Sequence, residues 1–469
     1  MNEQFGEKVK TIFDSITVLQ AKDSDLKRDN ANINGDSPMG AMLQYGANTA
    51  KEYNLEYLIK PAIAELHRDG WIHIHDLDFY AWTTTCTQIE LRKLFKNGFN
   101  TGHGHLRAPK SIGSYAALAA IAIQSNQNDQ HGGQSVVDFD YAMAEGVRYT
   151  YQKYLKEGYE ICERLNDLKD KEWILDYAME KTTRDTYQAM EGLIHNLNTM
   201  HSRAGAQVPF SSINYGTDTS WEGRLAIEQL LLATEAGLGN GETPIFPIQI
   251  FRVKEGVNYN PDDLNYDLFK LAMKVSAKRL FPNFAFIDAP FNLQYYKPGH
   301  PETEVAYMGC RTRVMGNVYD PSREIAPGRG NLSFTSINLP RLGIESKGDY
   351  FTFFKLLDKM LDTTMQQLLD RYKIQASRVV RNFPFLMGEG VWMDSDGLSP
   401  DDTVGEVLKH GTLSIGFCGL AECLVALNGK HHGEDEFSQE LGLRIVGYIR
   451  DYCNRKSTEL SMNVTCLAT

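Results

Sequence analysis

Two neighbouring stretches decide the fold of this chain: YMGCRT at residues 307–312 and GRGNLSFTSIN at residues 328–338. An apolar run at residues 283–288 precedes them and a second one, residues 332–339, ends them, and both are typical of buried strands. The connection between these runs is rich in glycine and proline and contains Cys310, which predicts a loop rather than a helix. Loops of this length that begin and end in the core are usually functional, and this one carries a thiol.

The composition is that of a globular protein, with 469 residues, 42% of them hydrophobic and 23% charged. This length allows two domains or one large barrel-type domain. No apolar run reaches the roughly 20 residues of a membrane span, and the amino terminus lacks a signal-peptide core. Seven cysteines without a Cys-x-x-Cys pair predict free thiols in a reducing cytoplasm and no structural zinc. The net charge of −12 argues against nucleic-acid and membrane surfaces but allows a local basic pocket for an anionic small molecule.

Strand-like runs alternate with helical patterns along most of the chain, which predicts parallel strands covered by helices. The expected strands are residues 71–77, 83–89, 208–215, 246–253, 283–288, 332–339, 412–418 and 462–469. The expected helices are residues 39–69, 115–124, 138–203 as long helical patterns, 351–382 as a helix pair, 419–427 and 438–461. A doubly wound sheet and a closed barrel both fit this alternation, and residues 1–35 are expected to form an amino-terminal arm.

Several polar side chains interrupt these apolar runs. The amides of Asn214, Gln249 and Asn338 would need partners inside a barrel, and a bound substrate is one way to supply them. His73 and His75 lie two apart on one face of an expected strand and could share a metal. Because no third ligand has a suitable spacing, ordinary hydrogen-bonded histidines are the favoured interpretation.

Residues 125–135, with the sequence SNQNDQHGGQS, contain no aliphatic side chain. A solvated surface loop is one interpretation of this segment. Amides, hydroxyls and paired glycines also suit a loop that hydrogen-bonds sugars, bases or phosphates. The sequence leaves both alternatives open.

Six motifs, in the same order, carry a resemblance to the class III anaerobic ribonucleoside-triphosphate reductases, glycyl radical enzymes that make deoxyribonucleotides. They are HIHDLD at 73–78, TTCTQI at 84–89, QSNQND and HGGQS at 124–135, MGCRT at 308–312, GNLSFTSINLP at 330–340 and IGFCGLAE at 415–422. The resemblance implies a ten-stranded α/β barrel over residues 36–469, built from two antiparallel five-stranded halves around a central finger loop. The loop that carries Cys310 is similar to that finger.

The same resemblance implies the roles of three residues. Cys310 is similar to the family's thiyl cysteine, which abstracts hydrogen from C3′ of the ribose. Cys86 resembles the second active-site cysteine, which protonates the departing hydroxyl, and Asn331 matches the family's amide. Formate becomes the expected reductant of the ribonucleoside triphosphate substrate. Taken singly, each residue could instead be a buried free cysteine or an asparagine at the start of a strand.

The sequence departs from the family pattern at both ends. The catalytic motifs begin without an ATP-cone of about a hundred residues before them, so on–off control by dATP and ATP through such a domain is not expected. The family continues past a sequence similar to residues 467–469 into a substrate-phosphate loop, a four-cysteine zinc site and the radical glycine. We therefore expect a C-terminally incomplete barrel that contains no metal. On its own, this barrel is expected to have no catalytic activity. It would need a second polypeptide or further segment for the glycyl radical, and a radical-SAM activating enzyme.

Regulation is expected in the helices over residues 110–200. There the resemblance implies a homodimer interface that binds dNTP or ATP effectors. Lys153 is a candidate phosphate contact, although a solvated lysine is the favoured interpretation of that residue. Two other functions stay open: a non-catalytic nucleotide-binding fragment, and another glycyl radical lyase such as a pyruvate formate-lyase relative. That lyase family usually has adjacent cysteines at the finger tip, unlike residues 309–311.

Overall fold

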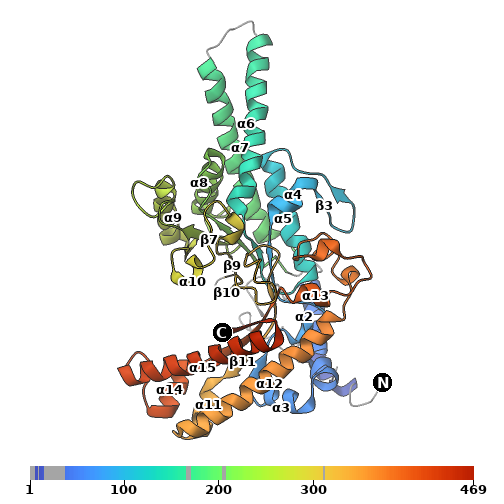
Figure 1. Cartoon of the computed structure of the whole chain (residues 1–469). Coiled ribbons are helices and arrows are strands. Elements are labelled where there is room, and N and C mark those ends of the chain that lie inside the picture. The colour runs from blue at the N-terminus through green and yellow to red at the C-terminus, as the bar shows by residue number, and fades with distance from the viewer. Residues whose placement is uncertain (1–5, 9, 15–36, 165–170, 203–206, 310–311) are drawn as a thin grey trace.

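The computed structural model describes residues 6–8, 10–14, 37–164, 171–202, 207–309 and 312–469 (Figure 1). Most of its strands form a five-stranded sheet, in the order β2-β5-β6-β7-β8, and a four-stranded sheet, in the order β1-β11-β12-β13. The first sheet consists of Thr87–Ile89 (β2), Gln134–Val136 (β5), Ser211–Tyr215 (β6), Ile248–Val253 (β7) and Asn283–Phe286 (β8). The second consists of Ile72–Ile74 (β1), Asn331–Asn338 (β11), Thr412–Cys418 (β12) and Asn463–Ala468 (β13).

The strands of the first sheet are all parallel, and in the second only β1 is antiparallel to its neighbour. Every residue of β6 and β7 is buried, as is typical of parallel strands covered on both faces. Two short hairpins complete the strands. They pair Phe99–Asn100 (β3) with His105–Leu106 (β4), and Tyr307–Met308 (β9) with Thr312–Arg313 (β10).

The two sheets are joined by backbone hydrogen bonds between β2 and the segment before β11. The Gln88 N–H donates to the carbonyl of Arg329, and the Gly328 N–H donates to the carbonyl of Gln88, both at 2.8 Å. The Thr412 N–H of β12 donates to the carbonyl of Gly330 at 3.0 Å. One edge of the first sheet therefore continues into the second through residues 328–330.

Helices pack against both sheets and connect their strands along the chain. Those of the first half are α2 (Pro38–Tyr53), α3 (Pro61–Arg68), α4 (Leu91–Asn97), α5 (Ile112–Asp129), α6 (Phe139–Arg164), α7 (Lys171–Thr199), α8 (Trp221–Ala236), α9 (Tyr266–Arg279) and α10 (Pro290–Leu293). Those of the second half are α11 (Leu339–Ser346), α12 (Tyr350–Ala376), α13 (Gly405–Leu408), α14 (Leu420–Asn428) and α15 (Glu436–Leu460). Helices α6 and α7 project from the body as a long hairpin, at the top of Figure 1.

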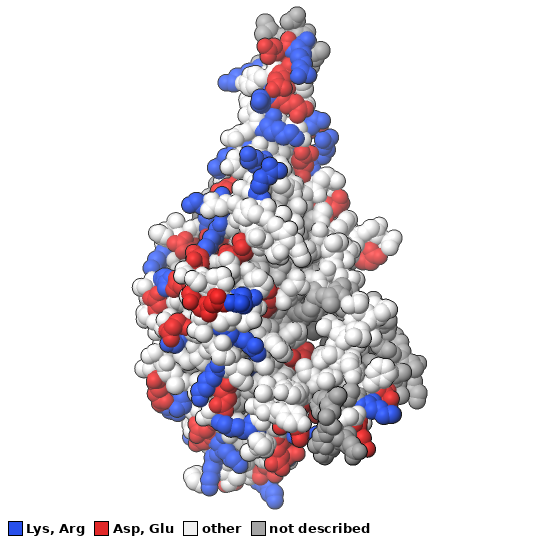
Figure 2. Space-filling model, turned by 90° about the vertical axis from the view of Figure 1, so that its right-hand side faces the viewer, with Lys and Arg blue, Asp and Glu red and all other residues white. Residues whose placement is uncertain are grey.

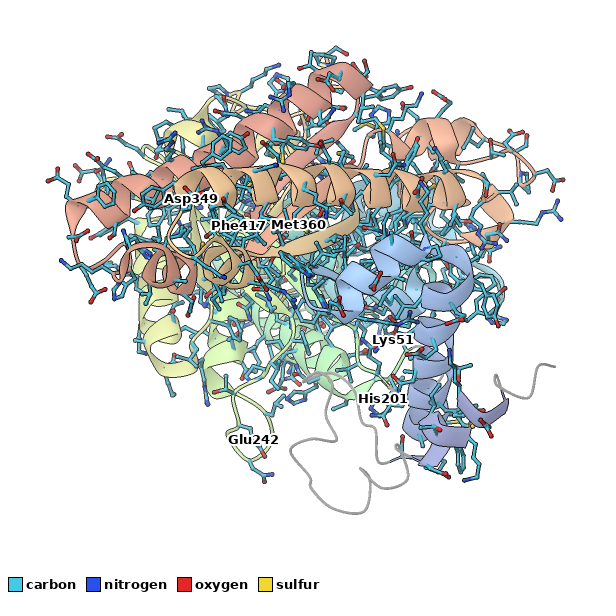
Figure 3. The ribbon with its side chains drawn as sticks, turned by 90° about the horizontal axis from the view of Figure 1, so that it is seen from below. Lys51, His201, Glu242, Asp349, Met360 and Phe417 are labelled. Atoms are coloured by element: carbon cyan, nitrogen blue, oxygen red, sulfur yellow. The ribbon has the colours of Figure 1, made fainter. Side chains whose placement is uncertain are left out.

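Helix α12 lies across the second sheet. Figure 3 labels Asp349 and Met360 along this helix and Phe417 of β12 beside it. The carboxylate of Asp349 caps the helix by accepting from the N–H groups of Phe351 and Thr352. The predicted helix pair over 351–382 is wrong, because no glycine or proline interrupts α12 before Ala376.

The predicted single helix over 39–69 is also wrong. A π-helical turn at Asn54–Leu58 follows α2, and Lys60 is extended with ψ 133°. The break has a simple cause, since the residue before a proline avoids the helical region and Pro61 begins α3. Gly70, with φ +76°, follows the end of the helical stretch.

The segment over residues 125–135 is not a surface loop. Helix α5 extends to Asp129, and most of the polar side chains that follow are buried. The amide of Gln130 donates to Thr84 Oγ1 at 2.7 Å and accepts from Thr87 Oγ1 at 2.6 Å. The carboxylate of Asp129 accepts from the N–H groups of residues 385 and 386. Most of these polar groups bind one another or the backbone, so the segment is largely part of the packed interior.

The predicted α/β class is confirmed, with half-sheets of five and four strands in the described residues where the resemblance implied five and five. Closure of the two sheets into a barrel stays a prediction, as do the domain boundaries at residues 35 and 36. None of the helices that the structure describes is both long enough and apolar enough to cross a membrane.

Candidate active site

The hairpin of β9 and β10 is the centre of the candidate site. Met308 pairs with Thr312, which leaves residues 309–311 as the connection between the two strands. Cys310, the predicted thiyl cysteine, lies outside the described residues, as does Arg311. Gly309 and Thr312, on either side of them, are described, and so are the residues that these two contact.

The first strand of this hairpin is held by side chains of the five-stranded sheet. The Tyr307 N–H donates to Asn214 Oδ1 at 2.8 Å, and Asn214 Nδ2 donates back to the Tyr307 carbonyl at 3.1 Å. Ser135 Oγ donates to the same carbonyl at 2.7 Å. The Gly309 N–H donates to Ser212 Oγ at 3.1 Å.

Gln88 of β2 extends this set of contacts, because its Nε2 donates to the carbonyl of Ala306 at 2.8 Å. All four side chains that hold the hairpin are fully buried. We call them the hairpin clamp: Gln88, Ser135, Ser212 and Asn214.

Buried charges anchor the base of the hairpin. Arg252 of β7 forms ion pairs with Glu304 at 2.7 Å and with Asp140 at 3.3 Å. Asp140 also accepts from the N–H groups of residues 216–218. Burial raises the pKa of the Glu304 carboxyl, and the guanidinium of Arg252 opposes that rise. The ion pair of Arg252 and Glu304 therefore lies close in sequence to the first residues of the hairpin.

Arg329 holds the part of the chain that returns from the hairpin. Its guanidinium is fully buried and donates to the carbonyls of Met315 and Gly316 at 2.6 Å and of His410 at 3.0 Å. Burial lowers the pKa of Arg329 to about 10, which still leaves it charged at neutral pH. Both arms of the loop are therefore fixed by buried side chains.

Cys86, the second predicted cysteine, lies directly beside the hairpin. Its side chain packs with Met308 from the first arm and Val314 from the second. Its N–H donates to the carbonyl of Asn331 at 3.2 Å. Burial raises the pKa of the Cys86 thiol to about 12, although a hydrogen bond from the Asn331 backbone lowers it. At neutral pH the group is a protonated thiol that can give a proton, not a thiolate nucleophile.

Asn331 begins β11 and lines a cavity of about 580 Å³. The hairpin contributes Thr312 and Arg313 to its wall, and Ser414 and Thr465 contribute hydroxyls from the strands β12 and β13. Such a wall of amide, hydroxyl and guanidinium groups suits a polar ligand with oxygen atoms.

The three amides that were expected to need a substrate have protein partners. Asn214 binds Tyr307, as described above, and Gln249 binds the Tyr215 hydroxyl and Thr234 Oγ1, each at 2.7 Å. Asn338 caps α11. A bound substrate, which was one way to supply these partners, is not needed, because other residues of the chain already supply them.

The histidine pair behaves as ordinary polar residues. His75 Nε2 lies 2.8 Å from Ser336 Oγ, and the ring stacks on Phe334 with the centroids 4.0 Å apart. The His73 ring meets the His75 ring edge-on at 4.5 Å. Within the described part of the chain, no three His, Cys, Asp or Glu side chains gather in a way that could hold a metal ion.

Lys153, the predicted effector contact, is exposed on α6. It lines a groove of about 450 Å³ between α5, α6 and α7, together with Ser111, Asp185 and Asn196. Figure 2 shows basic and acidic residues interspersed along the projecting hairpin of α6 and α7. The groove, rather than the surface charge of the hairpin, distinguishes Lys153 from the other lysines of α6.

Comparison with known proteins places these features in a family. A family model described as anaerobic ribonucleoside-triphosphate reductase matches residues 29–469. The chain belongs to this family. It is 32% identical over 426 residues to the anaerobic ribonucleoside-triphosphate reductase of Escherichia coli K12, covering 90% of this chain and 57% of that protein. The enzyme of the same description from bacteriophage T4 is 30% identical, with 89% of this chain and 67% of the phage protein covered.

Solved reductase structures share the fold. The anaerobic ribonucleotide reductase of Thermotoga maritima with glycerol in its active site superposes with a TM-score of 0.69 at 14% identity, over 98% of this chain and 71% of that chain. The same protein in complex with dATP and CTP gives a TM-score of 0.67, over 99% of this chain and 75% of that chain. The chain thus spans a little over half the length of the bacterial reductases that it matches in sequence.

Sequence reasoning missed most of the hairpin clamp. Gln88 and Ser135 lie inside two of the motifs, but no role was assigned to them. The only local signal is the alternation of Ser212 and Asn214 on one face of β6, which marks a polar stripe on a buried strand.

Proposed function

We propose that this chain is the catalytic part of an enzyme that reduces ribonucleoside triphosphates to deoxyribonucleoside triphosphates by thiyl-radical chemistry under anaerobic conditions. The observation that carries the proposal is the placement of Cys86. It is a buried, protonated thiol packed against both arms of the hairpin whose connection contains Cys310. Such an arrangement provides one thiol for hydrogen abstraction and a second for proton transfer.

Each residue then has a defined task. Cys310 removes the C3′ hydrogen of the ribose and returns it at the end of the turnover. Cys86 protonates the departing 2′-hydroxyl, for which its thiol is in the required protonated form at neutral pH. Asn331 presents an amide to the polar cavity, and formate is the proposed reductant. A glycyl radical, supplied by a segment beyond those present here, would provide the oxidising equivalent for Cys310.

The proposal extends to partners. A radical-SAM enzyme activates the glycine, and the chain works in the cytoplasm as a homodimer whose interface includes the helices over residues 110–200. Effector dNTP or ATP binds in the groove between α5, α6 and α7. The relative from Thermotoga maritima, solved with dATP in a specificity site, supports nucleotide binding by the fold.

The test is deoxynucleotide formation by this chain together with a segment that corresponds to the remaining part of its relatives. The activating enzyme, formate and a ribonucleoside triphosphate are supplied without oxygen, and the 469-residue chain alone serves as the control. We expect product from the mixture and none from the chain alone. Nucleotide binding without product would instead favour a non-catalytic nucleotide-binding protein.

Lys153→Ala should weaken effector binding about tenfold, the usual effect of losing one charged hydrogen bond of about 1.5 kcal/mol. Isothermal titration calorimetry with each dNTP measures the affinity. Lys156→Ala is the matched control, because Lys156 is exposed on the same helix but does not line the groove. Equal affinities for wild type and Lys153→Ala would eliminate Lys153 as a phosphate contact.

A further inference from the structure

The contacts of β6 with the hairpin form a ladder made from side chains. Ser212 and Asn214 are two residues apart on one face of β6, and the backbone groups that they bind belong to Gly309 and Tyr307, also two residues apart. Two strand residues span about 6.6 Å, so the two spacings match. Residue numbers decrease along β6 as they increase along the hairpin arm, so the two segments are antiparallel. The two contacts together fix the register of the hairpin against the sheet.

Asn214 has a special place in this ladder. Its carboxamide binds both the N–H and the C=O of Tyr307, as a neighbouring strand would, and it also donates to Ser135 Oγ at 3.1 Å and to the Val136 carbonyl at 2.9 Å. The side chain is fully buried, so water cannot replace these bonds. Without Asn214, both the N–H and the C=O of Tyr307 lose a partner on β6, and the arm can shift relative to this strand.

We infer that Asn214 is a positioning residue for the proposed radical reaction, and that it sets where residue 310 begins by fixing the arm Tyr307–Gly309 against β6. The inference rests on the proposed function. Hydrogen abstraction requires the reacting atoms to lie about 3–3.5 Å apart, and a displacement of about 1 Å can lower the rate about 100-fold. Gly309 is covalently joined to Cys310, so a shift of the arm moves the point from which that residue continues.

The main variant is Asn214→Leu, which keeps the branching of the side chain at Cγ and removes its hydrogen bonds. Gln249→Leu is the matched control: Gln249 is a buried carboxamide on the neighbouring strand β7, with two side-chain partners and no contact with the hairpin. Ser212→Ala is a milder second variant, which removes only the acceptor of the Gly309 N–H. All three are measured in the reconstituted enzyme and in the 469-residue chain.

We expect kcat of Asn214→Leu to fall about 100-fold while KM stays within about threefold, because Asn214 does not line the polar cavity at Asn331. The isotope effect with substrate deuterated at C3′ should rise, since hydrogen abstraction becomes slower than the other steps. Gln249→Leu should keep the wild-type isotope effect even if it unfolds at a lower temperature. A kcat for Asn214→Leu no lower than that of Gln249→Leu, or an unchanged isotope effect, would overturn the inference.

Amide hydrogen exchange tests the same inference without activity. In the 469-residue chain, the Tyr307 amide should exchange at least about tenfold faster in Asn214→Leu than in Gln249→Leu, and Ser212→Ala should release the Gly309 amide alone. If wild type makes no deoxynucleotide, the proposed function fails, while the exchange rates still decide the role of Asn214. Unchanged exchange at Tyr307 in Asn214→Leu would show that the arm is held by something else. Should Asn214→Leu not fold, Ser212→Ala decides by the same kcat, isotope and exchange measurements.

Discussion

Replacing Cys310 with serine is expected to abolish deoxynucleotide formation in the reconstituted enzyme. The O–H bond of a serine is much stronger than the S–H bond of a cysteine, so a serine cannot form the radical that removes the C3′ hydrogen. The two side chains have similar shapes, and the clamp acts on the backbone of residues 306–309, so the hairpin should keep its place. Product is measured by chromatography after anaerobic incubation with substrate and formate, and substrate affinity should stay within about twofold of wild type.

Cys162→Ser is the control for this substitution. Cys162 lies on α6, partly buried and outside the hairpin and its cavity, so its serine variant should retain wild-type turnover. Retained turnover in Cys310→Ser would remove Cys310 from the radical role. The proposed function would then need a different hydrogen-abstracting group, because it assigns proton transfer to Cys86.

The sequence predicted those elements whose signal lies in neighbouring residues. Residues 332–339 and 412–418 are apolar runs of strand length bounded by turn residues, and the structure has them as the paired strands β11 and β12. Gly70 and Gly429 end their helices with positive φ, as their positions next to helical patterns indicate. Breaks inside helical patterns were harder, and Pro61 was overlooked although its effect on Lys60 is also local.

The candidate site was less accessible, because its contacts are not local. The clamp residues bind backbone groups that are between 93 and 218 residues away in the sequence. Every residue has such backbone groups, so the sequence does not indicate which of them is bound. For the same reason a polar stretch such as residues 125–135 is indistinguishable from a solvated loop until its partners are known. The motif resemblance identified Cys310, Cys86 and Asn331 as candidate site residues. Their roles stay predictions.

Gly330→Ala is expected to disturb the junction of the two sheets strongly. A Cβ at this position would lie 1.8 Å from the carbonyl oxygen of Cys86 and 2.7 Å from its carbonyl carbon, far inside contact distance. These are backbone atoms, so no side chain can rotate away, and either Cys86 or the start of β11 at Asn331 must move. Overpacking of this kind typically costs 1–3 kcal/mol and occasionally more, so we expect a loss of about 3 kcal/mol.

Urea unfolding of the purified chain measures this loss as a lower midpoint. Gly447→Ala is the control, because that glycine lies inside α15 with no atom within 4 Å of an added Cβ. Alanine there should raise stability by roughly 0.5–1 kcal/mol through its better helix propensity. In the reconstituted enzyme Gly330→Ala should also lower turnover at least about 100-fold, since it separates Cys86 and Asn331 from the hairpin. A midpoint equal to wild type would mean that the backbone of residue 330 does not approach Cys86 as closely as described, and the proposed placement of the second thiol would fall with it.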